Sequence, residues 1–446
     1  MPTNLSAAVA SSSDEPVIAA GSARVGGPQA TWPCLPATSS IINGNIETFI
    51  HQHWNSTVSP RTSEELADYL ALANCGHLFD GWRYLSQATL ALLNGSRGQA
   101  LHLAYYAELR AALSILAGSG IGIVNKKNFA LTQTGDVHWF RGPTHSAAWE
   151  ALVEWAKKPT QAVKVMSCFE ALDLPASSWG EACNVSPSLP DIASKWLQEW
   201  SVDINTVGKD QFLRNKASYQ PNLSVNGFNQ LDESEVKFIY GISSSCNPIS
   251  NGGLEFVDQM LMLDLCKKAC QIRFEDVNQS NMDEVWNDVS SWLQNSGHLT
   301  EADSNTLIGN LKNCAQSPAS QIFANAAPTV ESSVGVISRA FLLLRLASAL
   351  TRNQWIEVQL RGGTAARSWH TNSLHSFGAW ANVWSVGTSP GSFGGLDADR
   401  VDAEDDLYNW LQSNRPFIAR KMWDEIPKPL IALCRFERVA LLAINP

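Results

Sequence analysis

The chain has 446 residues, of which 45% are hydrophobic and 17% are charged. This composition is typical of a folded protein with a large apolar core, and it excludes a chain that is disordered throughout. The formal net charge of −10 at pH 7 excludes a general nucleic-acid coat protein, because such a protein needs an excess of lysine and arginine to neutralise phosphates. A local basic groove is still compatible with this charge.

The N-terminal segment is rich in alanine, serine, glycine and proline, and it predicts a disordered tail over 1–40. It lacks the basic region followed by an apolar stretch that defines a signal peptide. We therefore expect a cytoplasmic protein.

Residues 41–160 predict a helical domain with one small β element. The run TSEELADYLALANC places Thr62 three residues before Glu65, which is the pattern of a capping box. Two apolar helices follow, HLFDGWRYLSQATLALLNG and GQALHLAYYAELRAALSILAGSG, and each is closed by glycine. The short runs IGIV, NFALTQ and DVHWF then predict a small antiparallel element near 120–140.

Residues 161–330 predict a helical middle region joined by polar loops. The C-terminal domain, 331–446, begins with the apolar helix SVGVISRAFLLLRLASAL. We interpret this helix as buried and amphipathic, because it is too short for a membrane span and carries Arg339 and Arg345. No membrane contact is therefore expected.

The run WIEVQL predicts a second short β element near 354–360, because it is rich in β-branched and aromatic residues. The expected fold class is mainly α, with multi-helix domains and short antiparallel β elements near 120–140 and 354–360. The C-terminal domain could echo the first one.

Nine cysteines are scattered along the chain, and no CxxC pair occurs. Cys266 and Cys270 lie one helical turn apart, but no second pair of metal ligands lies nearby in the sequence. We interpret them as two reduced thiols on one helix face and expect no structural metal. Walker loops, GxGxxG after a strand, GxSxG elbows and kinase signatures are also lacking, so no cofactor is expected.

Two related motifs, RGPTHSAAW (141–149) and RGGTAARSW (361–369), share Arg, Gly, Thr and Trp at the same offsets. Each follows a predicted strand, so each is expected to turn at glycine and to open a helix with Thr144 or Thr364 as N-cap. The exposed N–H groups of a helix start, together with an arginine fork, suit a phosphate or a carboxylate. A duplication and a chance likeness both stay open, and so does a purely structural role.

Histidines and a further arginine surround both motifs, but no HExxH pattern indicates a metal. The predicted anion-binding residues are Arg141, Thr144, His145, Arg361, Thr364, Arg367, His370 and His375.

The run RGQALH places Arg97 and His102 at the start of the longest predicted helix. It resembles the R-x(4–6)-H motif of the HEPN superfamily of helical nucleases, although the polar residue that usually follows the arginine is replaced by Gly98. The resemblance implies that Arg97 stabilises phosphate charge and that His102 moves a proton, without a metal. The alternative is a partly buried structural histidine.

A wider segment, residues 60–160, is similar to the N-terminal helical portion of YaaC-like and HEPN-like bacterial proteins. The shared features are a Tyr-rich apolar helix, a short β excursion and a His-bearing turn. The resemblance implies a prokaryotic cytoplasmic protein from an antiviral or mobile-element locus.

We expect a non-catalytic or conditionally active component of a bacterial defence-type system, which acts through a protein partner and a local phosphate or RNA site. The alternative is a metal-independent HEPN-like endoribonuclease that uses Arg97 and His102, or the arginines and histidines of 361–375. The sequence does not indicate the oligomeric state.

Overall fold

The computed structural model confirms a mainly α protein with a small antiparallel sheet, and helices make up 78% of the residues that the structure describes. The described residues are 3–25, 46–54, 56–171, 174–185, 210–215, 231–246, 254–296, 300–314, 320–327, 329–374, 396–413, 419–426, 430–436 and 439–440.

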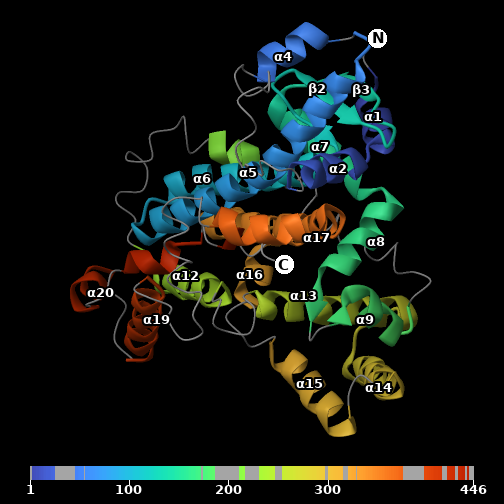
Figure 1. The fold of residues 1–446 in the computed structure, drawn as a ribbon. Coiled ribbons are helices and arrows are strands. Elements are labelled where there is room, and N and C mark those ends of the chain that lie inside the picture. Colours follow the sequence, from blue (N-terminus) through green and yellow to red (C-terminus); the bar gives the residue numbers. More distant parts are fainter. Residues whose placement is uncertain are drawn as a thin grey trace.

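Two long antiparallel helices, α5 (Pro60–Leu93) and α6 (Arg97–Gly118), form the centre of the molecule (Figure 1). The hydroxyl of Ser59 caps α5 by accepting from the backbone N–H of Thr62, and Gly95 turns the chain with a φ of 72°. The runs TSEELADYLALANC and HLFDGWRYLSQATLALLNG, predicted as two helices, therefore belong to one continuous helix. The capping box predicted at Thr62 is wrong, because the cap lies three residues earlier.

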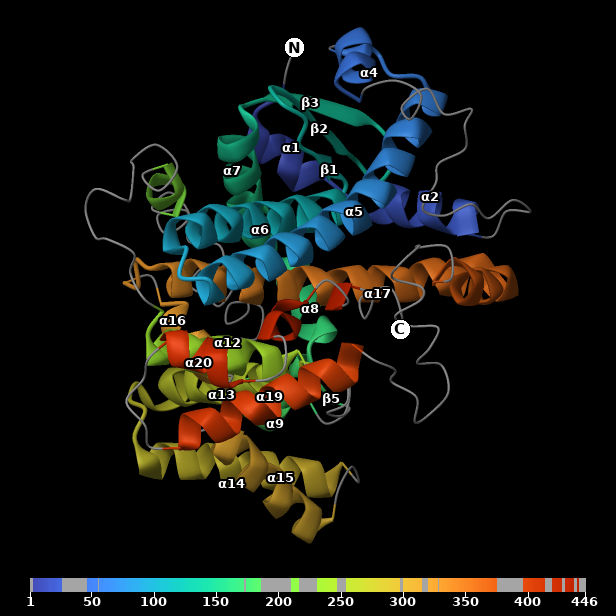
Figure 2. The same ribbon diagram turned by 90° about the vertical axis from the view of Figure 1, so that its left-hand side faces the viewer.

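Helix α17 (Ser333–Leu374) packs along the α5–α6 pair (Figure 2). The approach to α5 is close at Gly81, where an added Cβ would come within 2.6 Å of Leu344 Cδ2. The segment Ser333–Arg361 is long and apolar enough to cross a membrane, but 94% of its apolar window is buried inside the protein. Its apolar residues therefore serve as core here.

The strand predicted near 354–360 is wrong, since this segment continues α17 without a break. Trp355 and Val358, three residues apart, are both buried on one side of the helix. The Trp355 indole donates to Cys75 Sγ at 3.0 Å, and the Gln354 amide donates to the Gly118 carbonyl at 3.1 Å. These tertiary contacts outweigh the weak strand preference of the local sequence.

The antiparallel element predicted near 120–140 is confirmed as a three-stranded sheet in the order β1 (Ile121–Gly122), β2 (Lys127–Leu131), β3 (Val137–Arg141). Its β2–β3 register pairs Phe129 with Trp139. Helix α7 (Thr144–Ala156) follows β3 after two residues and packs back on α6.

The disordered tail predicted over 1–40 is wrong for residues 3–25, which form α1 (Leu5–Ser11) and α2 (Glu15–Val25). The small side chains of Ala8 and Val9 are fully buried. The Lys158 ammonium donates to the carbonyl of Val9 at 3.2 Å. A segment rich in alanine is thus ordered, because small side chains let helices approach the core closely. Residues 26–45 lie outside the described part.

The other elements surround this frame. They are α4 (Ile46–His53), α8 (Pro159–Cys168), β4 (Glu170–Ala171), β5 (Leu174–Pro175), α9 (Ala176–Ala182), α12 (Glu233–Ser245), α13 (Glu255–Phe274), α14 (Gln279–Asn295), α15 (Glu301–Cys314), α16 (Ser320–Asn325), α19 (Leu396–Gln412), α20 (Ala419–Glu425) and the 3-10 turn η3 (Leu430–Cys434).

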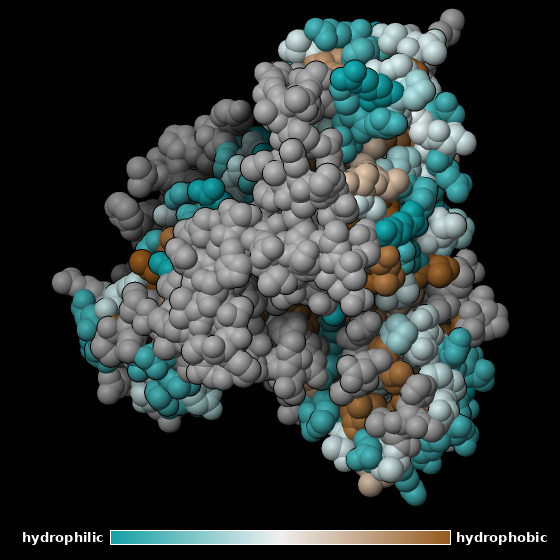
Figure 3. Space-filling view, viewed as in Figure 1, coloured by the Kyte–Doolittle hydropathy of each residue, from teal (hydrophilic) through white to brown (hydrophobic). Residues whose placement is uncertain are grey.

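The molecule is layered. The sheet, α1 and α7 lie on one side of the α5–α6 pair, and α17 lies on the other (Figures 1 and 2). Helices α13, α14 and α15 lie beyond α17. One continuous cluster of buried apolar side chains runs from Ala8 to Ala440. On the face drawn in Figure 3, hydrophilic residues cover much of the end where Figure 1 places α4 and the strands.

Candidate functional site

The first RGxT motif lies where the sequence predicts it, between a strand and a helix. Arg141 ends β3, and Thr144 is the first residue of α7. The prediction that Thr144 caps the helix is wrong, because Pro143 takes the N-cap position and the Thr144 hydroxyl donates to the Asn125 carbonyl at 3.2 Å. Arg141 is exposed, with its guanidinium carbon 5.9 Å from the centre of the Trp54 ring.

The second motif is not a turn. Arg361, Thr364, Arg367 and His370 all lie inside α17, so Thr364 caps no helix and no free N–H groups face an anion there. Arg361 donates two hydrogen bonds to the Glu15 carboxylate, at 2.5 and 3.1 Å. The side chains from 362 to 374 are not described, and His375 lies outside the described residues. The motif copies therefore differ in local structure despite their shared letters.

Arg97, the predicted catalytic arginine, is held by carboxylates. Its Nε and Nη2 donate to the two Glu235 oxygens at 2.5 and 2.7 Å, and Asp232 lies 3.5 Å away. Hydrogen bonding to Glu235 raises the pKa of Arg97 further above its usual range. A forked ion pair of this kind fixes the start of α6 against the start of α12.

His102 lies one and a half turns further along α6 and meets residues of α7 there. We call the group His102, Tyr105, Tyr106, His145 and Arg214 the His–Arg cluster. The His102 ring lies 5.0 Å from the Tyr106 ring, and the Tyr106 ring lies 6.3 Å from the His145 ring. His102 of the RGQALH run and His145 of the first RGxT motif therefore share one site.

Tyr105 fixes the position of His145. The Tyr105 hydroxyl and His145 Nδ1 are 2.9 Å apart and share a hydrogen bond, and the Trp149 indole donates to the same hydroxyl at 3.4 Å. Burial raises the pKa of Tyr105 to about 12, so its hydroxyl keeps its proton at neutral pH. The bond at Nδ1 leaves Nε2 as the ring nitrogen that can meet a ligand.

Arg214 supplies the positive charge of the cluster. Its guanidinium carbon lies 5.3 Å from the Tyr105 ring centre and 5.2 Å from the Tyr106 ring centre. Its Nη2 donates to the Tyr106 hydroxyl at 3.0 Å. Within the described residues, Arg214 has no carboxylate partner and its Nε has no hydrogen-bond acceptor. Its Nη1 donates to Asn215 Oδ1 at 2.6 Å, so the described residues leave its positive charge without a carboxylate to neutralise it.

A buried ion pair anchors Arg214. Residues 210–215 form a short helical segment, in which Asp210 lies one turn before Arg214. Asp210 accepts two hydrogen bonds from Arg339 of α17, at 2.8 and 2.6 Å, and Arg339 lies 3.9 Å from Glu108 of α6. Because Glu108 is three residues beyond Tyr105, the anchor and the cluster use neighbouring turns of the same helix.

Both histidines are half-buried, and their pKa values fall below the usual range. Burial lowers the pKa of His102 and of His145 first, and the Arg214 guanidinium lowers both further. Both are therefore mainly neutral at pH 7, and each can accept a proton. A bound phosphate would raise both pKa values, because its negative charge stabilises the imidazolium form.

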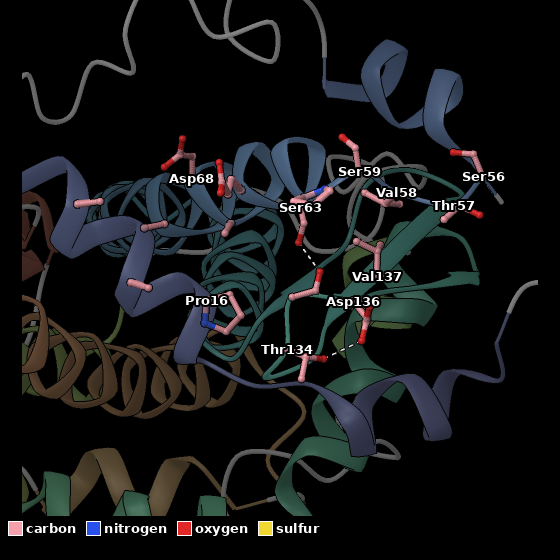
Figure 4. Close-up of a pocket in the computed structure, with 17 residues that line it drawn as sticks. Pro16, Ser56, Thr57, Val58, Ser59, Ser63, Asp68, Thr134, Asp136 and Val137 are labelled. Atoms are coloured by element: carbon pink, nitrogen blue, oxygen red, sulfur yellow. Dashed lines mark hydrogen bonds between the residues drawn. The ribbon is translucent and has the colours of Figure 1, made fainter.

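Two cavities outside the His–Arg cluster have linings that do not favour an anion. A cleft of 860 Å³ lies between α2, the start of α5 and the β2–β3 turn, where Ser63 donates to the Gly135 carbonyl and Thr134 donates to Asp136 at 2.7 Å (Figure 4). Its lining holds carboxylates and hydroxyls without a lysine, arginine or histidine, so it does not suit an anion. A second cavity of 540 Å³ contains Arg97 beside the carboxylates that neutralise it.

Comparison with models of protein families, with curated proteins and with solved structures finds no match to this chain. The likeness to HEPN-like and YaaC-like proteins therefore stays a prediction from the sequence. Arg214, Tyr105 and Tyr106 are the cluster residues that sequence reasoning missed. No local motif marks Arg214, which is 108 residues from Tyr106 along the chain and reaches it only through the fold.

Proposed function

We propose that this protein is a metal-independent ribonuclease whose active site is the His–Arg cluster. The observation that carries the proposal is the guanidinium of Arg214, which lacks a carboxylate partner in the described part of the chain and lies beside two half-buried histidines. Arg97 and Arg361, by contrast, are neutralised by glutamates. Arg214 replaces Arg97 as the phosphate-binding arginine of the proposed site.

The chemistry uses the nucleophile that RNA itself carries. One histidine, His102, takes the proton of the ribose 2′-hydroxyl, whose oxygen then attacks the adjacent phosphorus. The bond from phosphorus to the 5′-oxygen breaks, and the leaving oxygen takes a proton from His145, whose imidazolium form the bound phosphate stabilises. The products are a 2′,3′-cyclic phosphate and a 5′-hydroxyl end. Arg214 stabilises the charge that develops on the non-bridging oxygens.

DNA is not expected to be cleaved, because it lacks the 2′-hydroxyl that this route needs. From the sequence resemblance we further propose that the protein acts in the bacterial cytoplasm, in a defence-type system with a protein partner. Such a setting suits a nuclease that is active only under certain conditions.

The test is cleavage of a labelled single-stranded RNA by the purified full-length chain in EDTA. We expect His102→Ala and His145→Ala each to lower the rate by about 10²–10⁴-fold, which is the usual contribution of a general acid or base. Arg214→Gln should lower it by a similar factor. Arg83→Ala is the matched control, because Arg83 is an exposed arginine of α5 outside the cluster.

The products distinguish the mechanism, since a cyclic phosphate end is expected and a 5′-phosphate end would exclude it. If RNA stays intact but wild type binds it and Arg214→Gln does not, the site is a non-catalytic phosphate site, as the leading sequence hypothesis has it. If Arg214→Gln and Arg83→Ala bind and cleave alike, the His–Arg cluster has no such function.

A further inference from the structure

A second group of cations lies at the end of the sheet, beyond the His–Arg cluster. We call Lys126, Lys127, Arg141, His51 and Trp54 the strand-end patch. Lys127 and Arg141 are direct partners in the β2–β3 register, and like charges opposite each other destabilise a sheet. Within the described residues, neither of the two has a carboxylate partner. The fold therefore tolerates an unfavourable pair here.

The ring of Trp54 contacts both cations where no carboxylate of the described residues does. The Lys127 ammonium lies 5.5 Å from the centre of the Trp54 ring, and the Arg141 guanidinium carbon lies 5.9 Å from it. The electron-rich face of an indole attracts both cations without neutralising them. Trp54 is itself supported by Trp139, whose ring centre is 5.4 Å away.

The patch is accessible. Lys126, Arg141 and His51 are exposed, and Lys127 and Trp54 are half-buried. The Lys127 ammonium lies 2.5 Å from His51 Nδ1, which holds the lysine close to α4. A chain with a net charge of −10 thus presents, at this one end of its sheet, cations beside an aromatic ring.

We propose that the strand-end patch binds single-stranded RNA. Cations that have no carboxylate partner attract the phosphates of a polynucleotide, and the aromatic ring offers a stacking face for an unpaired base. A duplex does not fit equally well, because its bases are already stacked on one another. A peptide with carboxylates would use the cations but would gain less from the indole.

The patch continues into the His–Arg cluster along the chain. Only Gly142, Pro143 and Thr144 separate Arg141 from His145, and Thr144 is tied by its hydroxyl to Asn125, next to Lys126. The patch therefore ends four residues before His145 along the chain. The choice of RNA over DNA rests on the proposed function, whereas strand binding by the patch does not require cleavage.

The experiment measures binding of a labelled 2′-O-methyl oligonucleotide, which cannot be cleaved by the proposed route, to the full-length chain at several salt concentrations. We expect Lys127→Ala and Arg141→Ala each to weaken binding by about 3–10-fold and to reduce the salt slope by about one. Trp54→Phe keeps an aromatic side chain for folding and should weaken binding by a smaller factor.

Lys312→Ala is the matched control. Lys312 also lies over an indole, 5.6 Å from the Trp286 ring centre, but it pairs with Asp283 at 3.8 Å. Its removal should leave binding and salt slope unchanged. Unchanged binding by Lys127→Ala and Arg141→Ala would overturn the inference. It would also be overturned if polyglutamate or duplex RNA competed for the site as strongly as single-stranded RNA does.

The two proposals can fail separately. Weaker binding by the strand-end variants together with no cleavage by wild type would leave the patch standing and reject the ribonuclease. Cleavage that depends on His102 and His145 but is indifferent to Lys127 and Arg141 would keep the ribonuclease and reject the patch.

Discussion

Arg339 and Arg214 show how differently two arginines can be used within one small region. The Arg339 side chain is 8% exposed and forms a forked ion pair with the Asp210 carboxylate, and Glu108 lies 3.9 Å away. Arg214, one turn beyond Asp210, lies on two tyrosine rings without a carboxylate partner in the described part of the chain. A neutralised, buried guanidinium holds elements together, whereas one that keeps its charge can bind an anion.

The largest effect is expected where a buried pair is broken. Arg345 of α17 donates to Asp258 of α13 at 2.8 Å through Nε, and also through Nη2. Asp258→Ala should lower the free energy of unfolding by about 3–5 kcal/mol, because it leaves a guanidinium buried and unpaired. Urea denaturation checks this, with Asp283→Ala as a control at a half-exposed ion pair. Equal losses in both variants would show that burial of the Arg345 pair has no special weight.

The pH dependence of stability tests the surroundings of Arg339 through Glu108, which lies 3.9 Å from it. Burial raises the pKa of Glu108 well above 4.5, and the Asp210 charge adds to this. The folded state therefore binds this proton more tightly than the unfolded state. Stability from this group is present below pH 4.5 and is lost as the pH rises from there toward the raised pKa.

Glu108→Gln mimics the protonated acid, so it should be more stable than wild type at pH 8, and the difference should shrink toward pH 4.5. Melting temperatures of both proteins across this range test the sign. Parallel curves would mean that Glu108 is ionised in the folded protein.

A smaller change in stability is expected for Arg214. Arg214→Gln removes a stacked cation and the hydrogen bonds to Tyr106 and Asn215 at a half-buried site, at a cost of about 1 kcal/mol. The same change should abolish the stabilisation of wild type by millimolar inorganic phosphate in a thermal shift assay. Phosphate stabilisation that survives in Arg214→Gln would place the anion elsewhere.

The smallest effect is expected at Arg361. Its pair with Glu15 is exposed on both sides, at 40% and 43%, so Arg361→Ala should cost about 0.5 kcal/mol or less. Thermal unfolding at low and high salt checks this. A loss as large as that of Asp258→Ala would show that the contact between α2 and α17 depends on this ion pair.

Local pattern was sufficient for much of the fold. Helical periodicity and glycine turns predicted the α5–α6 region, and alternating residues before Arg141 predicted the small sheet. The failures have a common cause. The segment 354–360 has strand-like residues and 3–25 has few large apolar ones, yet Trp355 and Ala8 are buried by partners far along the chain.

The sequence predicted the two histidines of the site but not that they lie together. His102 and His145 were both named, because each follows an arginine near a helix start, but they were assigned to different sites with Arg97 and Arg141 as partners. Packing of α7 on α6 brings the histidines together. Glu235 neutralises Arg97, and the pair of Arg339 with Asp210 positions Arg214 in its place.

The sequence alone predicted the class of this protein, a mainly helical chain that contains a small antiparallel sheet, since turns and periodic apolar faces are encoded within a few residues. It also marked His102 and His145, each of which follows an arginine near a helix start. Only the tertiary structure decided which arginine keeps its charge available, because neutralisation depends on carboxylates brought from other helices. That decision separates Arg214 from Arg97, Arg339 and Arg361, which are identical in chemistry and differ only in their neighbours.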